Sequence, residues 1–135
     1  NGDTVRYVTL DELFAESDII SLHCPLTEET YHVIDRDALA KCKRGVGLLN
    51  TSRGALVDEK ALYQALVSGK LTGAALDVFE QEPVKADNPL FTLDNVCLAP
   101  HVSALTYETN YNGGIICAQS IINVYKGEKP VYPLW

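Results

Sequence analysis

Short apolar runs alternate along this chain with segments of helical spacing, and Gly, Pro, Asn and Asp punctuate the changes. Four runs predict strands, at residues 19–24, 46–50, 74–79 and 95–99, and a shorter β-prone run lies at residues 5–8. The first of the four reads IISLHC and is closed by Pro25. We therefore interpret it as a strand buried on both faces, which is typical of a parallel sheet.

Four segments predict helices, each with a recognisable start or end. Thr9 and Glu12 form a capping box before a short helix at residues 10–16. Asp35 precedes a second helix at residues 36–42, and Asp58 precedes a third. The third helix places Leu62, Leu66 and Leu71 on its inner side and ends at Gly69. A long last helix spans residues 105–125, where Ile115, Ala118, Ile122 and Tyr125 recur at helical spacing.

The resulting order, β-α-β-α-β-α-β-β-α, predicts an α/β fold with a mostly parallel sheet and flanking helices. No GxGxxG motif occurs, and Gly45-Val46-Gly47 leads into a strand rather than into a helix. A glycine turn that cradles phosphate has to follow a strand and open a helix. The pattern alone therefore predicts an α/β layer without a nucleotide fingerprint.

Length, composition and net charge disfavour several classes of function. The 135 residues fit one domain, and 47% hydrophobic residues with 21% charged ones indicate a globular chain. The net charge of −7 disfavours nonspecific nucleic-acid binding and adhesion to anionic membranes. No apolar run reaches the roughly 20 residues of a membrane span, and no signal-peptide pattern opens the chain.

Four cysteines, Cys24, Cys42, Cys97 and Cys117, form no CxxC pair. We expect buried, reduced thiols in a cytoplasmic protein, with neither disulfides nor a metal site.

Three strand ends carry side chains capable of chemistry. Arg53 follows the strand at 46–50, Glu82 follows the strand at 74–79, and His101 follows the strand at 95–99. Each alone is more simply read as a surface loop residue. Parallel strands, however, bring these ends to one edge of the sheet, where α/β proteins bind ligands. An arginine holds a carboxylate, and a histidine exchanges a proton near neutral pH. Together they indicate a site acting on the carbonyl or hydroxyl of a small carboxylic acid.

Other polar residues are weaker candidates for a functional role. His23 lies within an apolar run and is expected to be a core residue, and we expect a structural role for His32. Asp77 interrupts the run AALDVF, and an acid there needs a donor partner. It holds either a ligand amide or a nearby backbone group, and both readings stay open.

Four stretches together resemble the D-isomer-specific 2-hydroxyacid dehydrogenases. They are SDIISLHCPLTEETYHVID, LLNTSRGALVDEKALYQAL, GAALDVFEQEP and NVCLAPHVSALT, and the likeness spans nearly all of residues 7–130. The resemblance implies a partial Rossmann-like, doubly wound sheet and hydride transfer between NAD(H), or alternatively NADP(H), and a small 2-keto or 2-hydroxy acid. It implies that Arg53 binds the substrate carboxylate, that His101 is the acid/base and that Glu82 pairs with His101. The residues implied to line the cofactor site are Cys24, Pro25, Thr51, Ser52, Arg53, Asp77 and His101.

The resemblance covers only part of such an enzyme. Residues 1–135 correspond to the C-terminal part of a dinucleotide-binding domain, without the glycine-rich turn or the substrate domain. We expect an oxidoreductase fragment that is inactive on its own. The alternatives are an NAD-sensing binding module of the corepressor type and an inactive structural remnant. Because the strand at 19–24 would lack its neighbour in the family's sheet, we also expect a homo-oligomer that pairs through this edge or the last helix.

Overall fold

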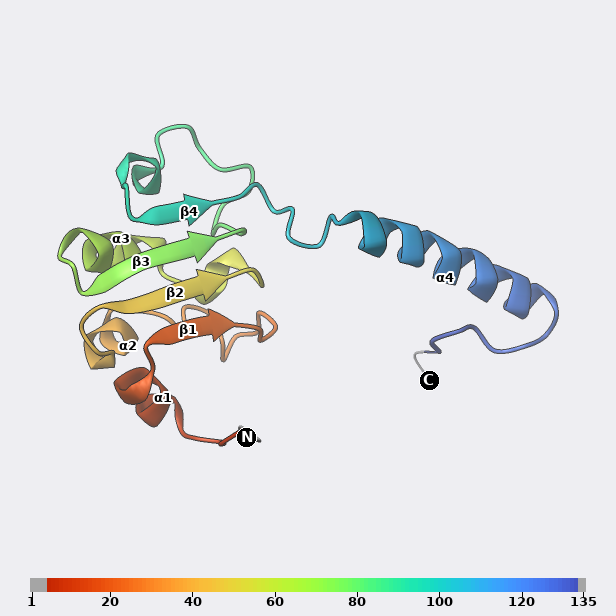
Figure 1. Ribbon diagram of the computed structural model, residues 1–135, viewed down its shortest axis with the longest axis horizontal. Coiled ribbons are helices and arrows are strands. Elements are labelled where there is room, and N and C mark those ends of the chain that lie inside the picture. The colour runs from red at the N-terminus through yellow and green to blue at the C-terminus, as the bar shows by residue number, and fades with distance from the viewer. Residues whose placement is uncertain (1–4, 134–135) are drawn as a thin grey trace. The chain divides into compact units, whose positions relative to one another are not determined.

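The computed structural model describes residues 5–133, which form two compact units. Unit 1, Asn1–His101, contains the sheet and the short helices. Unit 2, Val102–Trp135, contains the long helix α4 (Tyr107–Tyr125). Figure 1 labels the elements of both units.

Unit 1 is built on four parallel strands: β1 (Ile19–Leu22), β2 (Val46–Asn50), β3 (Leu71–Leu76) and β4 (Val96–Leu98). Their order in the sheet is β1-β2-β3-β4, the same as in the chain. Helices connect the first three strands, as parallel neighbours require. All four carboxyl ends therefore lie at the same edge of the sheet, where the arrows of Figure 1 point. The predicted Rossmann-like parallel architecture is confirmed.

The predicted helix starts are confirmed by their caps. In α1 (Leu10–Glu16), the Thr9 hydroxyl and the Glu12 carboxylate complete the capping box. In α2 (Arg36–Lys41), the Asp35 carboxylate accepts from the Ala38 N–H, and in α3 (Glu59–Val67) the Asp58 carboxylate accepts from the Ala61 N–H. Each cap satisfies a donor that the first helical turn would otherwise leave unpaired.

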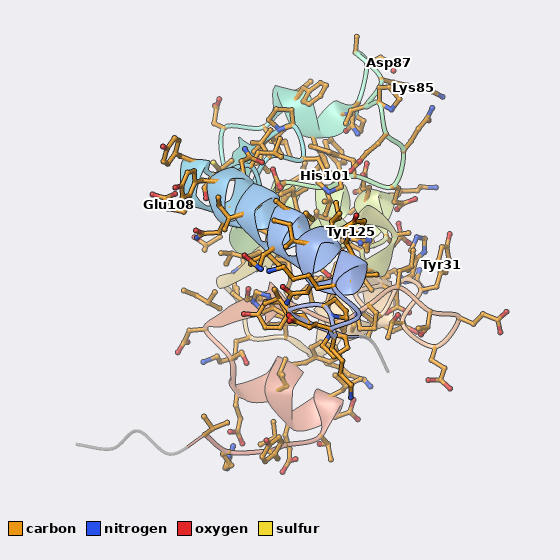
Figure 2. All side chains as sticks on the ribbon, turned by 90° about the vertical axis from the view of Figure 1, so that its right-hand side faces the viewer. Tyr31, Lys85, Asp87, His101, Glu108 and Tyr125 are labelled. Carbon is orange, nitrogen blue, oxygen red and sulfur yellow. The ribbon has the colours of Figure 1, made fainter. Side chains whose placement is uncertain are left out.

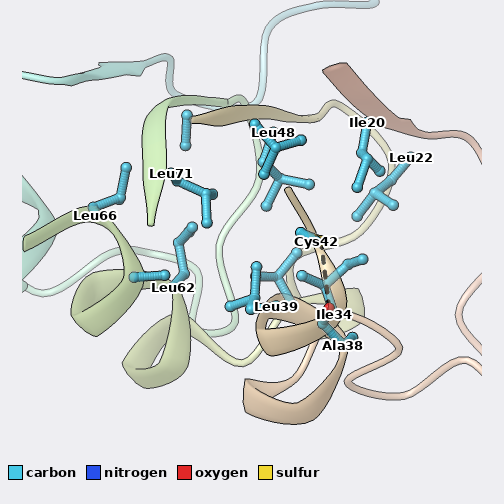
Figure 3. Packing of buried hydrophobic residues seen from close by; sticks show 14 of the residues in the cluster. Ile20, Leu22, Ile34, Ala38, Leu39, Cys42, Leu48, Leu62, Leu66 and Leu71 are labelled. Atoms are coloured by element: carbon cyan, nitrogen blue, oxygen red, sulfur yellow. Dashed lines mark hydrogen bonds between the residues drawn. The ribbon is translucent and has the colours of Figure 1, made fainter. Parts of the chain in front are cut away.

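The core lies between one face of the sheet and the helices α2 and α3 (Figure 3). Leu39 of α2 and Leu62 of α3 pack with Leu48 of β2 in one buried cluster. The expectation that the first strand is buried on both faces is wrong. Along β1 the exposed and buried positions alternate, so Ile20 is 6% exposed and Ile19 is 66% exposed. Only one side of this strand faces the core.

Some predicted boundaries are wrong as well. Residues 5–8 form no strand, and the described sheet does not include them. The third strand starts at Leu71 rather than at residue 74, because Gly69, with φ of +67°, turns the chain directly after α3. Leu71 then pairs with Val46 of β2 instead of lying on the helix. The loops also contain two short 3₁₀ helices, η1 (Gly54–Leu56) and η2 (Pro89–Thr92).

Unit 2 is a helix followed by a short tail. The helix α4 begins at Tyr107, two residues later than expected, because Thr106 caps it by accepting from the Thr109 N–H. In the tail, the Val131 N–H donates to the Ser120 hydroxyl and the Lys129 carbonyl accepts from Asn123. Within the described residues, no helix has both the length and the hydropathy that a bilayer span requires.

All four cysteines are free thiols, but only Cys42 is buried. Cys97 and Cys117 are exposed, so the expectation of buried thiols is wrong for these two. Cys97 lies in the short edge strand β4, where the residues on both sides of it are only partly buried.

Candidate functional site at the carboxyl ends of the strands

The predicted site residues gather where the strands of unit 1 end. Cys24 and Pro25 follow β1, Thr51 to Arg53 follow β2, Asp77 and Glu82 follow β3, and His101 follows β4. Figure 2 looks onto this edge of the sheet from the carboxyl ends, with His101 labelled. The sheet topology thus places them at the edge where open α/β sheets bind ligands.

His101 and Glu82 form a direct pair. The His101 Nδ1 lies 2.8 Å from the Glu82 Oε2, and both side chains remain partly open to solvent. His101 has a left-handed backbone, with φ of 56°, directly after Pro100. This conformation is uncommon for a residue with a side chain, although histidine adopts it more often than most. The pair leaves the second imidazole nitrogen, Nε2, for exchange with another molecule.

The Glu82 carboxylate is fixed from two sides. Its Oε1 accepts a hydrogen bond of 3.0 Å from the Phe79 backbone N–H, while its Oε2 meets His101. The hydrogen bond from His101 and then the one from Phe79 hold the pKa of Glu82 below its ordinary value. An ionised carboxylate only accepts hydrogen bonds, so Nδ1 of His101 carries the proton in this pair. That fixes the imidazole tautomer and the orientation of the ring.

Arg53 is held through its backbone by Asn50, which sequence reasoning missed. The Asn50 amide donates to the Arg53 carbonyl at 2.8 Å, and its Oδ1 accepts from the Ser52 N–H at 3.0 Å. Asn50 is only 1% exposed. A polar residue that closes a buried strand was the available signal, because such a group must find partners. The loop is therefore rigid at the residue that carries the cation.

The Arg53 side chain itself is exposed, and its Nη1 donates to the Ser52 carbonyl at 2.6 Å. Within residues 5–133 it makes no ion pair with an acidic side chain. Its charge and remaining donors are thus available for an anion, and a guanidinium suits a carboxylate with two parallel hydrogen bonds.

The other residues that the resemblance assigned to a cofactor lie in the loops after β1, β2 and β3. Ser52 Oγ donates to the Cys24 carbonyl at 2.7 Å, which joins the loops after β1 and β2. Asp77 is 4% exposed, and its N–H donates to the Asn50 carbonyl at 2.9 Å. Pro25 and Thr51 are exposed beside them. These polar and backbone groups suit a nicotinamide ring, whereas the sequence contains no glycine-rich turn for the pyrophosphate.

An apolar cavity of about 660 Å³ adjoins the histidine. Glu82 and His101 lie in its lining, and the rest is mainly apolar, including Phe79, Val84 and Phe91. The cavity thus offers apolar contact surface next to the Glu82–His101 pair, whose side chains remain partly open to solvent.

The other two histidines lie apart from this pair. His23 is exposed and bonds to the Ser21 hydroxyl at 2.8 Å, so the expectation of a core histidine is wrong. It follows the end of β1, on the exposed side of the alternation. His32 is half-buried, its N–H donates to the Ala55 carbonyl, and its Nε2 lies 3.3 Å from the Glu80 Oε1. Among the described residues, no group of three or more potential ligands could hold a metal ion.

Comparison with known proteins points to one family. Residues 1–103 match the family model described as D-isomer specific 2-hydroxyacid dehydrogenase, NAD binding domain. A glyoxylate reductase of Korarchaeum cryptofilum is 52% identical over 126 residues, which are 93% of this chain and 38% of that protein. A D-3-phosphoglycerate dehydrogenase of Archaeoglobus fulgidus is 48% identical over 91% of this chain and 23% of its own length.

Comparison with solved structures also finds a close likeness in fold. The crystal structure of the TT0316 protein from Thermus thermophilus superposes with a TM-score of 0.89 at 39% identity. The superposed region covers 100% of this chain and 44% of the Thermus thermophilus chain. The 135 residues therefore span less than half of the length of these relatives.

Proposed function

This chain belongs to the D-isomer specific 2-hydroxyacid dehydrogenase family through its NAD-binding domain, and from that premise we propose that its strand ends form the proton-transfer and anion-binding half of a 2-keto acid reductase site. The reaction is the reversible reduction of a small 2-keto acid to the 2-hydroxy acid. The hydrogen bond between His101 and Glu82 is the observation that carries the proposal.

The residues divide the chemistry between them. Arg53 binds the carboxylate of the keto acid through its guanidinium and polarises the neighbouring carbonyl. Bound NADH supplies the hydride that reduces the carbonyl carbon. His101, protonated on both nitrogens, gives a proton to the carbonyl oxygen, which becomes the hydroxyl of the product. Glu82 stabilises the imidazolium and keeps its ring oriented, and in the reverse direction His101 takes the proton back.

The cofactor site on this chain is a partial one. We assign Cys24, Pro25, Thr51, Ser52 and Asp77, together with Arg53 and His101, to the nicotinamide end of NAD(H). The assignment is supported by their position at one sheet edge and by the buried state of Asp77. We propose that residues 1–135 are the C-terminal part of a dinucleotide-binding domain and that they are inactive alone, because their sequence lacks a phosphate turn. The four free thiols suit a reducing compartment, and we place the protein in the cytoplasm.

The site and the relatives both support a substrate class. The named relatives reduce glyoxylate or oxidise 3-phosphoglycerate according to their names, and both reactions concern the carbon next to a carboxylate. A single arginine anchor beside an acid/base pair suits any such small acid. We therefore propose the class of small 2-keto and 2-hydroxy acids, with glyoxylate as the first compound to test.

The test is a chimera. Residues 5–133 replace the matching segment of the glyoxylate reductase of Korarchaeum cryptofilum, which supplies the remaining part of its own, longer chain. NADH oxidation is then measured with glyoxylate and with a panel of 2-keto acids, and NADH affinity is measured separately by titration calorimetry. We expect turnover with at least one 2-keto acid.

The chimera also distinguishes the enzyme from the two alternatives, an NAD-sensing binding module and an inactive structural remnant. Tight NADH binding with no turnover on any 2-keto acid would favour the NAD-sensing binding module over the enzyme. A folded chimera with neither binding nor turnover would contradict the proposal and favour the structural remnant.

A further inference from the structure

The segment after β3 lies against the segment that carries Arg53 with no space for a side chain between them. A Cβ built on Gly54 would lie 1.9 Å from the carbonyl carbon and oxygen of Phe79 and 2.5 Å from the Glu80 nitrogen. Backbone atoms cannot yield to such a clash as a flexible side chain can. Gly54 is therefore required by close backbone approach, although its neighbour Arg53 is the residue that carries the charge.

Two acidic residues tie the same segments together. The Glu80 carboxylate accepts from the Glu59 N–H at the start of α3, and the Glu59 carboxylate accepts from the Glu80 N–H, both at 2.7 Å. The other Glu59 oxygen accepts from the Asn88 amide at 3.0 Å. Hydrogen bonds to ionised carboxylates are stronger than neutral ones. This reciprocal pair holds the peptide between Phe79 and Glu80 against the segment from Arg53 to Glu59.

The same backbone also reaches the acid/base pair. The Phe79 N–H donates to Glu82 at 3.0 Å, and Glu82 in turn meets His101. One short stretch, Phe79 to Glu80, thus contacts the Gly54 backbone through its carbonyl and the Glu82 carboxylate through its N–H. A shift of this stretch would move both groups relative to each other.

We propose that Gly54 and Glu80 are positioning residues that fix the Phe79–Glu80 backbone and, through it, set the Glu82–His101 pair relative to the Arg53 loop. The inference rests on the function proposed above for Arg53, Glu82 and His101. It goes beyond that function because the proposed function assigns neither Gly54 nor Glu80 a role in binding or proton transfer.

The test uses the chain itself and NMR spectroscopy. The titration of the Glu82 side-chain carboxyl carbon reports whether the Phe79 and His101 hydrogen bonds are in place, and exchange of the Phe79 amide reports the first of them directly. The variants are Gly54→Ala, Glu80→Ala and Glu80→Gln. The control is Gly73→Ala, because a Cβ there would lie 2.9 Å from the Asn95 carbonyl oxygen, a crowded backbone contact at the other end of β3.

We expect the Glu82 pKa to move up toward 4.5 in Gly54→Ala and Glu80→Ala, with faster exchange of the Phe79 amide. Glu80→Gln keeps an oxygen that accepts from the Glu59 N–H, so it should restore the wild-type titration. Gly73→Ala should leave Glu82 unchanged even if it lowers stability. If Gly54→Ala does not fold, the comparison of Glu80→Ala with Glu80→Gln decides the matter alone.

An unchanged Glu82 titration in Glu80→Ala would overturn the inference, as would a Glu80→Gln variant that behaves like Glu80→Ala. These readouts need neither cofactor nor substrate. An inactive chimera would therefore contradict the proposed function but not the positioning role of Gly54 and Glu80. An unchanged Glu82 titration in Glu80→Ala would contradict the positioning role but not the proposed function.

Discussion

Glu82 and His101 follow neighbouring parallel strands, and their side chains meet at 2.8 Å between Oε2 and Nδ1. Nineteen positions separate them in sequence, so the pair depends on β3 and β4 lying side by side. The second Glu82 oxygen is occupied by the Phe79 N–H. The carboxylate therefore has defined partners on both oxygens although 37% of its side chain is exposed.

The first prediction concerns the titration of Glu82. Its pKa is depressed in the folded chain, first by the hydrogen bond from His101 and then by that from Phe79. A depressed carboxyl pKa adds stability that is present above the unfolded value and is lost as pH falls through the folded value. His101→Gln should raise the Glu82 pKa toward 4.5, as followed by NMR titration, and should reduce this acid-range dependence of unfolding.

His23→Gln is the matched control, because His23 is an exposed histidine whose hydrogen-bond partner is Ser21 rather than a carboxylate. It should leave the Glu82 titration as in the wild type. A Glu82 pKa that is the same in His101→Gln and in the wild type would contradict the assignment of the pair.

The second prediction concerns turnover in the chimera described above. His101→Ala removes the proton donor, and general acid/base catalysis contributes about 10²–10⁴-fold. We expect kcat to fall by a factor in that range. The dissociation constant of NADH should change much less, because His101 is only one of seven residues assigned to the cofactor, whereas it is the proposed proton donor. Steady-state kinetics and calorimetry measure the two quantities. A fully active His101→Ala chimera would remove His101 from the acid/base role.

The third prediction concerns Asn50, the buried residue that organises the Arg53 loop. Asn50→Ala leaves the Ser52 N–H and the Arg53 carbonyl without the partner they have now. An unsatisfied buried polar group costs about 1–3 kcal/mol, and because these two partners are only partly buried we expect the free energy of unfolding to fall by about that amount in total. Urea unfolding measures this change. Gln64→Ala on the exposed side of α3 is the control, and equal midpoints for the two variants would contradict the role of Asn50.

The gathering of Glu82 and His101 at one edge could be predicted from the sequence because strand ends are visible in it, whereas their direct pairing was implied by the family resemblance. Apolar runs mark the strands, parallel topology collects their ends, and Glu82 and His101 each lie within three residues of the end of such a run. The helix caps were predictable for a similar reason, since Thr9 with Glu12 and Asp58 act on residues only three positions away. Short-range capping interactions and the order of the strands therefore determine these features, and both can be read from the sequence.

The loop contacts could not be predicted in this way. The approach of Gly54 to Phe79 and the exchange of hydrogen bonds between Glu59 and Glu80 join segments more than twenty residues apart. They depend on the loop conformations, which periodicity does not describe. The burial of β1 was misread for a different reason, because Ser21 and His23 alternate with apolar residues in IISLHC and indicate a strand with one open face.

The last prediction concerns the free edge of the sheet. β1 is the outermost strand, so among the described residues its second edge has no partner strand. Ile19 is 66% exposed there, and an apolar hollow of about 380 Å³ lies beside the strand, lined in part by Leu10, Leu13 and Ile20. Unpaired backbone groups next to apolar side chains form a template for another strand. We therefore expect the chain to self-associate through this edge.

Multi-angle light scattering over a range of concentrations tests this expectation. The wild-type mass should exceed 14.8 kDa and rise with concentration. Ile19→Lys places a charge on the edge, which proteins use to block strand pairing, and should return the mass toward that of one chain. Val67→Lys, at a 58% exposed position of α3, adds the same charge away from β1 and should leave association unchanged. A wild-type chain that stays at 14.8 kDa at every concentration would show that the edge does not pair. If Ile19→Lys and Val67→Lys lower the mass equally, the association depends on net charge rather than on β1.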